Sequence, residues 1–480
     1  MYVQRFHKAI AGKSASPIDR RSLIFVVLVN LALAQTAAAD ERNLRCEGYQ
    51  GIWFSLGQRG EFGDKYSGGL ATYTAKHRPI AIYAPEVKKT FFVYGGTKAG
   101  KQHLLNMIGY YDHATGLVPK PVIVHDKQGI VDPHDNASLA IDGDGHLWVF
   151  VSGRGRSRPG FKYRSRKPFD INAFQRISEE EFTYPQPLWV QGQGFLHCFT
   201  KYTNGRELYW NTSEDGHAWT ADKKLAGMGG HYQNVECRGK RVLVAFNYHP
   251  GRNTVDKRTN LYLVYTDDRG ATWRTIQGDV IETPITDPNC AALVRDYESE
   301  GQLVYLKDLQ FDTDGNPVIL IVTSVHHMPG PAGDPRAWTV VRWDGKRWLF
   351  RQVTTSTHNY DMGQLWIESD SWRIIAPTEP GPQHWGAGGE IAMWESNDSG
   401  QTWVKQQLVT SRSPRNHTYV RRPLNAHPEF YAMWADGNPA ELSPSHLYFV
   451  DRDANQIRQL PYTMRSDWER PRVDTQTGGR

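Results

Sequence analysis

Short clusters of His, Tyr, Arg and Asn side chains carry the residues of this 480-residue chain best suited to chemistry. The main ones are His134 with Asn136, Tyr184, Arg206, His231 with Tyr232, and Tyr248 with His249. Carboxylates are scarce among them. Glycoside hydrolysis needs two Asp or Glu residues flanking the scissile bond, or a Tyr–Glu pair with an arginine triad as in sialidases, and the clusters supply neither set.

The same inventory suits β-elimination at a uronic acid. That reaction needs a positive group to neutralise the carboxylate, a base for the C5 proton and an acid for the leaving oxygen. Histidine and tyrosine can serve as base and acid when their surroundings tune their pKa values. Arginine can hold a carboxylate through two parallel hydrogen bonds. This chemistry needs no cofactor.

The clusters can act together only if the fold gathers them from distant parts of the chain. A polar or proline-containing cluster, an alternating apolar strand, a turn and a second apolar strand recur along the sequence. The seven repeats begin near Pro85, Pro133, Pro185, Tyr232, Pro288, Tyr360 and Pro428. They predict an all-β chain, a seven-bladed β-propeller of four-stranded antiparallel blades, in which the clusters before the first strands converge at one end of the channel. Residues 168–181 could hold a short helical turn.

Three turns share a pattern of Ser or Thr, Asp, Gly and Trp, at residues 213–219, 266–273 and 396–403. They resemble the Asp-box turn of BNR-type propellers. The Ser/Thr and Asp side chains can bond the backbone of the turn, and Gly can take a positive φ. We expect these Asp-box turns to stabilise hairpins and to take no part in catalysis.

Residues 1–39 have the features of a secretory signal peptide, with a basic flank at Arg20 and Arg21, an apolar run, and small residues before Asp40. Residues 40–480 then form a single β-propeller domain of a secreted or periplasmic protein. No stretch reaches the roughly 20 apolar residues of a spanning helix, so we expect no membrane span in the mature chain.

The charge balance excludes a globally basic, nucleic-acid-binding protein. The chain has 56 Lys and Arg against 51 Asp and Glu, and the signal peptide holds five of the former and one of the latter, so the mature chain is almost neutral. An anionic partner must therefore meet a local patch, such as the basic loop 154–167. Four cysteines allow three complete pairings, which the sequence leaves open. We expect a monomer.

Much of the chain, residues 46–450, resembles the BNR-4 group of seven-bladed propellers that includes ulvan lyases. The stretches that carry this likeness include GIWFSLGQ, TYPQPLW, KYTNGRELYW, GGHYQN, FNYHPG and HNYDMG. The resemblance implies an exported lyase that cleaves a uronate-containing, sulfated, ulvan-like polysaccharide with His, Tyr and Arg and without a catalytic metal.

Carried over by position, the resemblance makes His134 the catalytic histidine, Arg206 the carboxylate neutraliser and Tyr248 a catalytic or substrate-holding tyrosine. Tyr184 and His231 come next, and either Tyr184 or Tyr248 is the acid. The residues expected to bind substrate are Asn136, Tyr232, His249 and Arg258.

A metal is a separate question. Cysteine and histidine side chains from successive repeats are the right types for zinc, although no short spacing motif supports a site. The resemblance implies a structural metal near the axis. We expect a structural zinc ion on Cys290, His326, His327 and His358.

Two other functions remain open. The Asp-box turns favour a sialidase-like glycoside hydrolase, and the aromatic content, 12% with 16 Trp, favours a non-catalytic glycan-binding propeller.

Overall fold

The computed structural model describes residues 42–70, 76–98, 100–251 and 254–474. The predicted signal peptide, residues 1–39, lies outside them. Apart from the short 3-10 turns η1 (Pro133–Asp135), η2 (Val255–Lys257) and η3 (Pro331–Gly333), every regular element in this part of the chain is a β-strand. These elements all belong to one compact unit, Asn43–Arg480. No helix within the described residues is long and apolar enough to cross a membrane.

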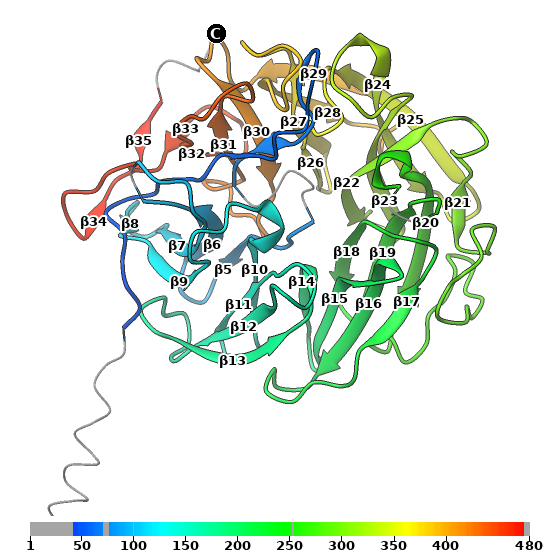
Figure 1. Cartoon of the computed structure of the whole chain (residues 1–480), viewed down its shortest axis with the longest axis horizontal. Helices are drawn as coiled ribbons and strands as arrows, with labels where there is room; N and C mark the ends of the chain where they lie inside the picture. The colour runs from blue at the N-terminus through cyan, green and yellow to red at the C-terminus, as the bar shows by residue number, and fades with distance from the viewer. Residues whose placement is uncertain (1–41, 71–75, 99, 252–253, 475–480) are drawn as a thin grey trace, which may run out of the picture. The chain divides into compact units, whose positions relative to one another are not determined.

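Seven antiparallel sheets form the blades (Figure 1). Blade 1 consists of β5 (Ala81–Ala84), β6 (Lys89–Gly96), β7 (Leu105–Asp112) and β9 (Val122–Asp126). Blade 2 consists of β10 (Ala137–Ile141), β11 (Leu147–Val151), β12 (Gly160–Ser165) and β13 (Phe174–Glu180). Blade 3 consists of β14 (Thr183–Val190), β15 (Gly194–Thr203), β16 (Gly205–Ser213) and β17 (Lys223–Ala226). The predicted architecture of four-stranded blades is thus confirmed from the first blade onwards.

The remaining blades repeat this pattern. Blade 4 consists of β18 (Gln233–Arg238), β19 (Arg241–Tyr248), β20 (Thr259–Thr266) and β21 (Leu293–Arg295), and blade 5 of β22 (Leu303–Phe311), β23 (Pro317–Ser324), β24 (Arg336–Trp343) and β25 (Trp348–Ser356). Blade 6 consists of β26 (Gln364–Ile367), β27 (Trp372–Glu379), β28 (Glu390–Ser396) and β29 (Val404–Leu408). Blade 7 consists of β30 (Asn416–Arg421), β31 (Ala432–Gly437), β32 (Leu447–Val450) and β33 (Ile457–Gln459). The short strand β35 (Arg472–Val473) extends blade 7 at its outer edge.

Alternation along each strand explains why the blades stack. In β11 every residue is buried, and its side chains separate by parity: Val149 joins the cluster shared with blade 1, whereas Trp148 and Phe150 pack against Phe195 of blade 3. Full burial of such a side chain contributes about 1.5–3 kcal/mol. Strands buried on both faces are therefore the main source of stability.

The first strands of neighbouring blades lie side by side in the same direction. Leu139 N donates to Pro79 O at 2.7 Å, and Val235 N donates to the Gln186 side chain at 2.8 Å. The polar clusters that precede these strands consequently meet at one end of the channel, which we call the mouth.

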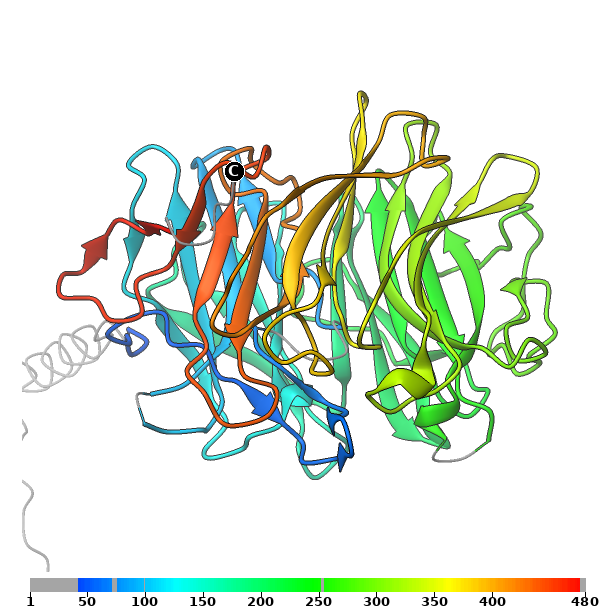
Figure 2. The same ribbon diagram turned by 90° about the horizontal axis from the view of Figure 1, so that it is seen from above.

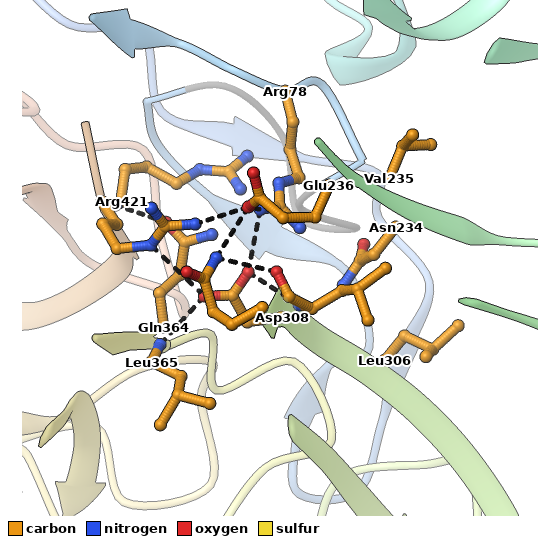
Figure 3. A network of polar contacts seen from close by, with 12 residues as sticks. Arg78, Asn234, Val235, Glu236, Leu306, Asp308, Gln364, Leu365 and Arg421 are labelled. Carbon is orange, nitrogen blue, oxygen red and sulfur yellow. Dashed lines mark hydrogen bonds and ion pairs between the residues drawn. The ribbon is translucent and has the colours of Figure 1, made fainter. Parts of the chain in front are cut away.

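Inside the channel, charged side chains satisfy one another. Arg78 contacts Asp308 at 2.8 Å, and Arg422 contacts Glu236 at 2.8 Å. Asp308 also accepts a hydrogen bond from Leu365 N at 2.9 Å. Figure 3 shows Arg78, Glu236 and Asp308 pointing toward one another from three different blades. We call this group the axial network, and it ties blades 1, 4, 5, 6 and 7 together.

A hairpin before blade 1, formed by β2 (Arg59–Gly60) and β3 (Gly63–Asp64), lies at the mouth. The ring of Phe62 contacts Trp385 at 5.8 Å, and Lys65 forms an ion pair with Asp256. Figure 2 shows this dark blue segment at the lower end of the blades in that view. Short strands β1 (Phe54–Ser55) and β4 (Ser67–Gly68) pair beside it, while β8 (Val118–Pro119) pairs with β34 (Trp468–Glu469).

The Asp-box turns lie at the end of the blades opposite the mouth and have the structural role predicted for them. Ser396 Oγ accepts a hydrogen bond from Gly400 N at 2.9 Å, and Asp398 Oδ1 accepts two more from the backbone that follows. Gly400 has φ +81° and packs against the Trp372 ring, where a Cβ would clash. The other two Asp-box turns make equivalent bonds.

Three of the seven predicted blade starts were wrong. Pro85 lies in the turn between β5 and β6, Pro428 in the loop between β30 and β31, and Pro288 in the connection to β21. The physical reason is that both ends of a blade carry proline, asparagine and aspartate in tight turns, so a turn between the first two strands resembles a cluster at the mouth.

The helical turn predicted in 168–181 was also wrong, because Phe174–Glu180 is strand β13. All four cysteines are free.

Candidate functional site

Six of the predicted residues meet at the mouth between blades 2, 3 and 4: His134, Tyr184, Arg206, Tyr232, His249 and Arg258. Their rings and guanidinium groups form one continuous set of contacts. The Tyr184 ring lies 5.3 Å from the His134 ring and 5.5 Å from the Tyr232 ring, and the Arg206 guanidinium lies 5.4 Å from the Tyr184 ring. The distance in sequence between these residues is large, so the site exists only because the blades surround an axis.

His134 is oriented by a local turn. Pro133 starts the 3-10 turn η1, and the Asp132 carboxylate caps it by accepting bonds from the backbone N–H of His134, at 3.0 Å, and from its Nδ1, at 2.5 Å. Burial lowers the pKa of His134 to about 4 even though Asp132 acts in the opposite direction. The ring is therefore neutral near pH 7 and held in one orientation.

Asp132 is in turn held by the basic loop. Arg154 and Arg158 contact its Oδ2 at 2.8 and 2.6 Å. Burial raises the pKa of Asp132, but the hydrogen bonds from His134 and Arg158 outweigh it, and the net effect is a pKa below the usual range. Arg154 and Arg158, in the connection between β11 and β12, thus supply positive charge beside the site, and part of that charge already fixes the aspartate. The predicted loop 154–167 is only partly a loop, because Gly160–Ser165 is strand β12. Sequence reasoning missed Asp132, although an Asp directly before a Pro that starts a helical turn is a typical N-cap.

Tyr184 has a strained backbone. Its φ is +54°, a region that non-glycine residues rarely adopt, at a cost of order 1–3 kcal/mol. Its N–H donates to Ser152 Oγ at 3.1 Å, and its carbonyl accepts from the Gln233 side chain at 3.2 Å. Strain of this kind persists where surrounding bonds enforce it, and it concentrates at functional sites.

Two guanidinium groups lie beside Tyr232, one at its hydroxyl and one over its ring. Arg206 Nη1 donates to Tyr232 Oη, and the Arg258 guanidinium lies 4.7 Å from the Tyr232 ring. Burial raises the pKa of Tyr232, but Arg206 and Arg258, with a hydrogen bond from Tyr184, lower it by more, so its pKa lies below the ordinary value. Burial instead raises the pKa of the nearby Tyr66 to about 12. Tyr232 therefore loses its proton more readily than an ordinary tyrosine does.

Arg206 forms the rim of this arrangement. Its Nε and Nη2 donate to Tyr202 Oη at 3.2 and 3.1 Å, and both side chains are partly exposed. Tyr202 was missed by sequence reasoning, and nothing in its local sequence separates it from other strand tyrosines. Arg206 and Tyr202 are therefore the part of the site that an anionic ligand can reach.

The buried polar atoms of the site that have no hydrogen-bond partner among the described residues include Arg258 Nη2 and His249 Nε2. The Arg258 guanidinium lies in a cage of the Tyr232, Tyr305 and Tyr360 rings, at 4.7, 4.8 and 5.4 Å. Leaving a buried donor unpaired costs about 1–3 kcal/mol. A ligand with a carboxylate or hydroxyl group could satisfy both atoms.

Three predicted site residues have other positions. Both ring nitrogens of His231 are used by the backbone, Nδ1 toward Asn247 O at 2.8 Å and Nε2 toward Met228 N at 3.2 Å. Tyr248 donates to Glu298, which lies outside the set of contacts described above, and burial with this carboxylate raises the pKa of Tyr248. Asn136 ends the η1 turn, and its amide donates to Pro133 O at 3.3 Å. We therefore assign all three to the scaffold.

The predicted zinc ligands are not brought together. Cys290 packs at the edge of the blade 4 cluster, where burial raises the pKa of its thiol, whereas His326 and His327 follow β23 of blade 5. His358 lies before β26, and its Nδ1 accepts from the backbone N–H of Tyr360 at 3.0 Å. The error follows from the misplaced repeat at Pro288, which assigned Cys290 to the wrong end of its blade. The group of His, Cys and acidic residues whose ligand atoms do converge within the described chain is a different one, considered below.

Together, the mouth offers positive charge for an anion, a tyrosine of lowered pKa and a second tyrosine hydrogen-bonded to it. A neutral histidine lies beside them. This set can neutralise a carboxylate and move a proton without a metal.

Comparisons with known proteins agree with this fold. The model for BNR repeat-containing family members matches residues 106–356, just over half of the chain. The solved structure of a PL25 ulvan lyase bound to -[GlcA(1-4)Rha3S]- is 16% identical, with a TM-score of 0.68 over 85% of this chain and 96% of that one. The polysaccharide lyase Uly1 is 10% identical, with a TM-score of 0.58 over 86% of this chain and 99% of that one. No curated protein sequence matches the chain. At these low identities, the two comparisons show that the chain shares the fold of these solved structures.

Proposed function

The chain belongs to the BNR repeat-containing family, and from that premise we propose that it is an exported polysaccharide lyase that cleaves a uronate-containing, sulfated polysaccharide by β-elimination. The observation that carries the proposal is Tyr232, whose hydroxyl accepts a hydrogen bond from Arg206 and whose ring lies beside Arg258 and Tyr184. The likeness in fold to an ulvan lyase solved with a glucuronate–rhamnose-3-sulfate ligand supports the choice of substrate class.

Each residue has a role in this proposal. Arg206, on the rim, pairs with the uronate carboxylate and so makes the C5 proton more acidic, assisted by the unpaired Nη2 of Arg258. Tyr232, in its ionised form, removes the C5 proton. The C4–O4 bond breaks, a C4=C5 double bond forms, and Tyr184 delivers a proton to the leaving oxygen. The neutral His134 packs against Tyr184 and fixes its position.

This assignment differs from the sequence-based one at the second tyrosine. Tyr248 donates a hydrogen bond to Glu298, and its raised pKa keeps it protonated near neutral pH, so it is not available as a base. Tyr232 was expected only to bind substrate. Because the pKa of Tyr232 is lowered and that of Tyr248 is raised, we assign the proton transfer to Tyr232.

Product analysis tests the proposed reaction. Incubation with a glucuronate–rhamnose-3-sulfate polymer should yield fragments that absorb ultraviolet light through the new double bond and that are lighter than hydrolysis products by one water. Saturated fragments with new reducing ends would instead support a glycoside hydrolase. Binding without any fragments would support a glycan-binding propeller.

A pH series tests the role of Tyr232. If its ionised form is the base, kcat/KM rises as the pH rises through its pKa. The Arg258→Met variant removes one of the two positive charges, raises that pKa and should move the rising limb to higher pH. An unchanged limb in Arg258→Met would contradict the assignment of Tyr232 as base while leaving the lyase reaction itself untouched.

A further inference from the structure

At the end of the blades opposite the mouth, one cluster of metal-binding side chains joins the first blade to the last. It consists of His113, which follows β7 of blade 1, and His427 and Glu429, which lie in the loop between β30 and β31 of blade 7. Their ligand atoms all lie within 4.8 Å of one another. This cluster is separate from the proposed lyase site, and no step of the proposed reaction uses it.

The distance between two of these atoms already fits a metal site. His113 Nδ1 lies 3.2 Å from Glu429 Oε2. Two ligands of a tetrahedral zinc ion, each about 2.0–2.1 Å from the metal, are about 3.3 Å apart. A carboxylate oxygen and an imidazole nitrogen at this separation need a positive centre between them, either a proton or a metal ion.

The second nitrogen of His113 is held in the way that metal-ligating histidines require. Its Nε2 lies 2.8 Å from Thr90 Oγ1 of β6, which fixes the ring orientation and leaves Nδ1 directed at Glu429. The His113 side chain is only 4% exposed.

The third side chain completes the set. The His427 ring lies 3.9 Å from the His113 ring, centroid to centroid, at an angle of 47°. The Glu429 side chain is 50% exposed, which lets solvent supply a fourth ligand. Two imidazoles and one carboxylate with an open position match the ligands of known zinc sites.

The position of the cluster suggests its role. Near it, the first and last blades are joined by the backbone of Leu424, which bonds to Ala81 O and Tyr83 N at 2.9 Å each. We propose that His113, His427 and Glu429 bind one divalent transition-metal ion of the zinc class, which links blade 1 to blade 7 and stabilises the closed ring.

Metal titration of the full-length mature protein tests this proposal. After treatment with EDTA, the protein should bind one equivalent of Zn²⁺ by calorimetry, and Co²⁺ should give the visible absorption of a tetrahedral or five-coordinate site. The variants His427→Gln and Glu429→Gln should each weaken Zn²⁺ binding by at least about tenfold, since even the loss of a partner outside the ligand set costs 10–100-fold. The matched control is His103→Gln, which removes a partly exposed histidine beside Asp126 and should change nothing.

Thermal unfolding provides the second readout. Zn²⁺ should raise the Tm of the wild type and of His103→Gln, because a ligand that binds only the folded state stabilises it, and should not raise that of His427→Gln. The proposal is overturned if the wild type binds no stoichiometric metal, or if both ligand variants bind Zn²⁺ as the wild type does. Lyase activity that persists in EDTA would leave the proposal intact, so the two hypotheses fail separately.

Discussion

The two ends of the blades use polar residues in opposite ways. In the Asp-box turns, the oxygens of Ser396 and Asp398 are bonded to the backbone of their own turn. At the mouth, Arg258 Nη2 and His249 Nε2 have no partner among the described residues, and Tyr184 has a strained backbone. Polar groups that satisfy one another stabilise the fold, whereas polar groups held in place but left unsatisfied are available to a ligand.

The largest effect should come from the mouth. Tyr232→Phe removes the hydroxyl proposed as base, and general-base catalysis is worth about 10²–10⁴-fold in rate. We expect kcat to fall by that factor while the free energy of unfolding changes little, because the ring remains packed against Tyr184. Product formation in initial-rate assays, with urea unfolding alongside, measures both.

The matched control for this change is Tyr248→Phe, which removes a hydroxyl bonded to Glu298. Its kcat should stay within a few-fold of the wild type. A large loss of kcat in Tyr248→Phe, with Tyr232→Phe active, would reverse the assignment of the two tyrosines.

Among these substitutions, the largest loss of stability should come from the axial network. Asp308→Ala leaves Arg78 buried without its 2.8 Å partner, and breaking a buried ion pair costs about 3–5 kcal/mol. Urea unfolding should show this loss. The exposed pair of Arg241 and Asp267 is the control, and Asp267→Ala should cost less than about 1 kcal/mol. Equal effects of the two substitutions would show that the channel charges are as well solvated as surface charges.

Acid should destabilise the fold through buried histidines. The pKa of His134 and of His231 is lowered to about 4, and that of His358 to about 3, in each case first by burial. Because the unfolded state, with pKa near 6.5, binds these protons more readily, stability is present above pH 6.5 and is lost as the pH falls toward 4. Each histidine should cost roughly 1.4 kcal/mol per pH unit in this range.

Urea unfolding at pH 7.5 and pH 5.5 measures this loss. Stability that is equal at the two pH values would mean that these histidines are not buried in a neutral form.

The smallest effect should come from a single Asp-box turn. Asp398→Ala removes the acceptor for two backbone N–H groups in a turn that is otherwise intact, which should cost about 1 kcal/mol. The kcat should be unchanged. A loss of activity without a loss of stability would mean that the two ends of the blades are coupled, and the contrast between them would fail.

The repeats were enough to predict the seven blades, because alternation and turn residues are local properties of the sequence. They could not tell the two ends of a blade apart: Pro85 and Pro428 occupy turns chemically similar to the polar clusters at the mouth. The second difficulty was to predict which residues of a strand take part in the site. Tyr248 and Asn247 are adjacent on β19, yet only Asn247 bonds to Tyr232 N at the mouth.

Residues whose position depends on tertiary contacts were the hardest to predict. The lowered pKa of Tyr232 arises from Arg206, in β16 of blade 3, and from Arg258, which lies between β19 and β20 of blade 4. The joining of His113 to Glu429 arises from closure of the ring, which brings residues more than 300 positions apart into contact. No local spacing encodes either arrangement.

The most direct test of the central claim is the crystal structure of the Tyr232→Phe variant with a uronate-containing, sulfated tetrasaccharide. The account predicts the sugar at the mouth between blades 2, 3 and 4, with its carboxylate within hydrogen-bond distance of Arg206 or Arg258 and with the C5 carbon facing residue 232. A sugar bound at the Asp-box end, or at the mouth with its carboxylate directed away from both arginines, would contradict it.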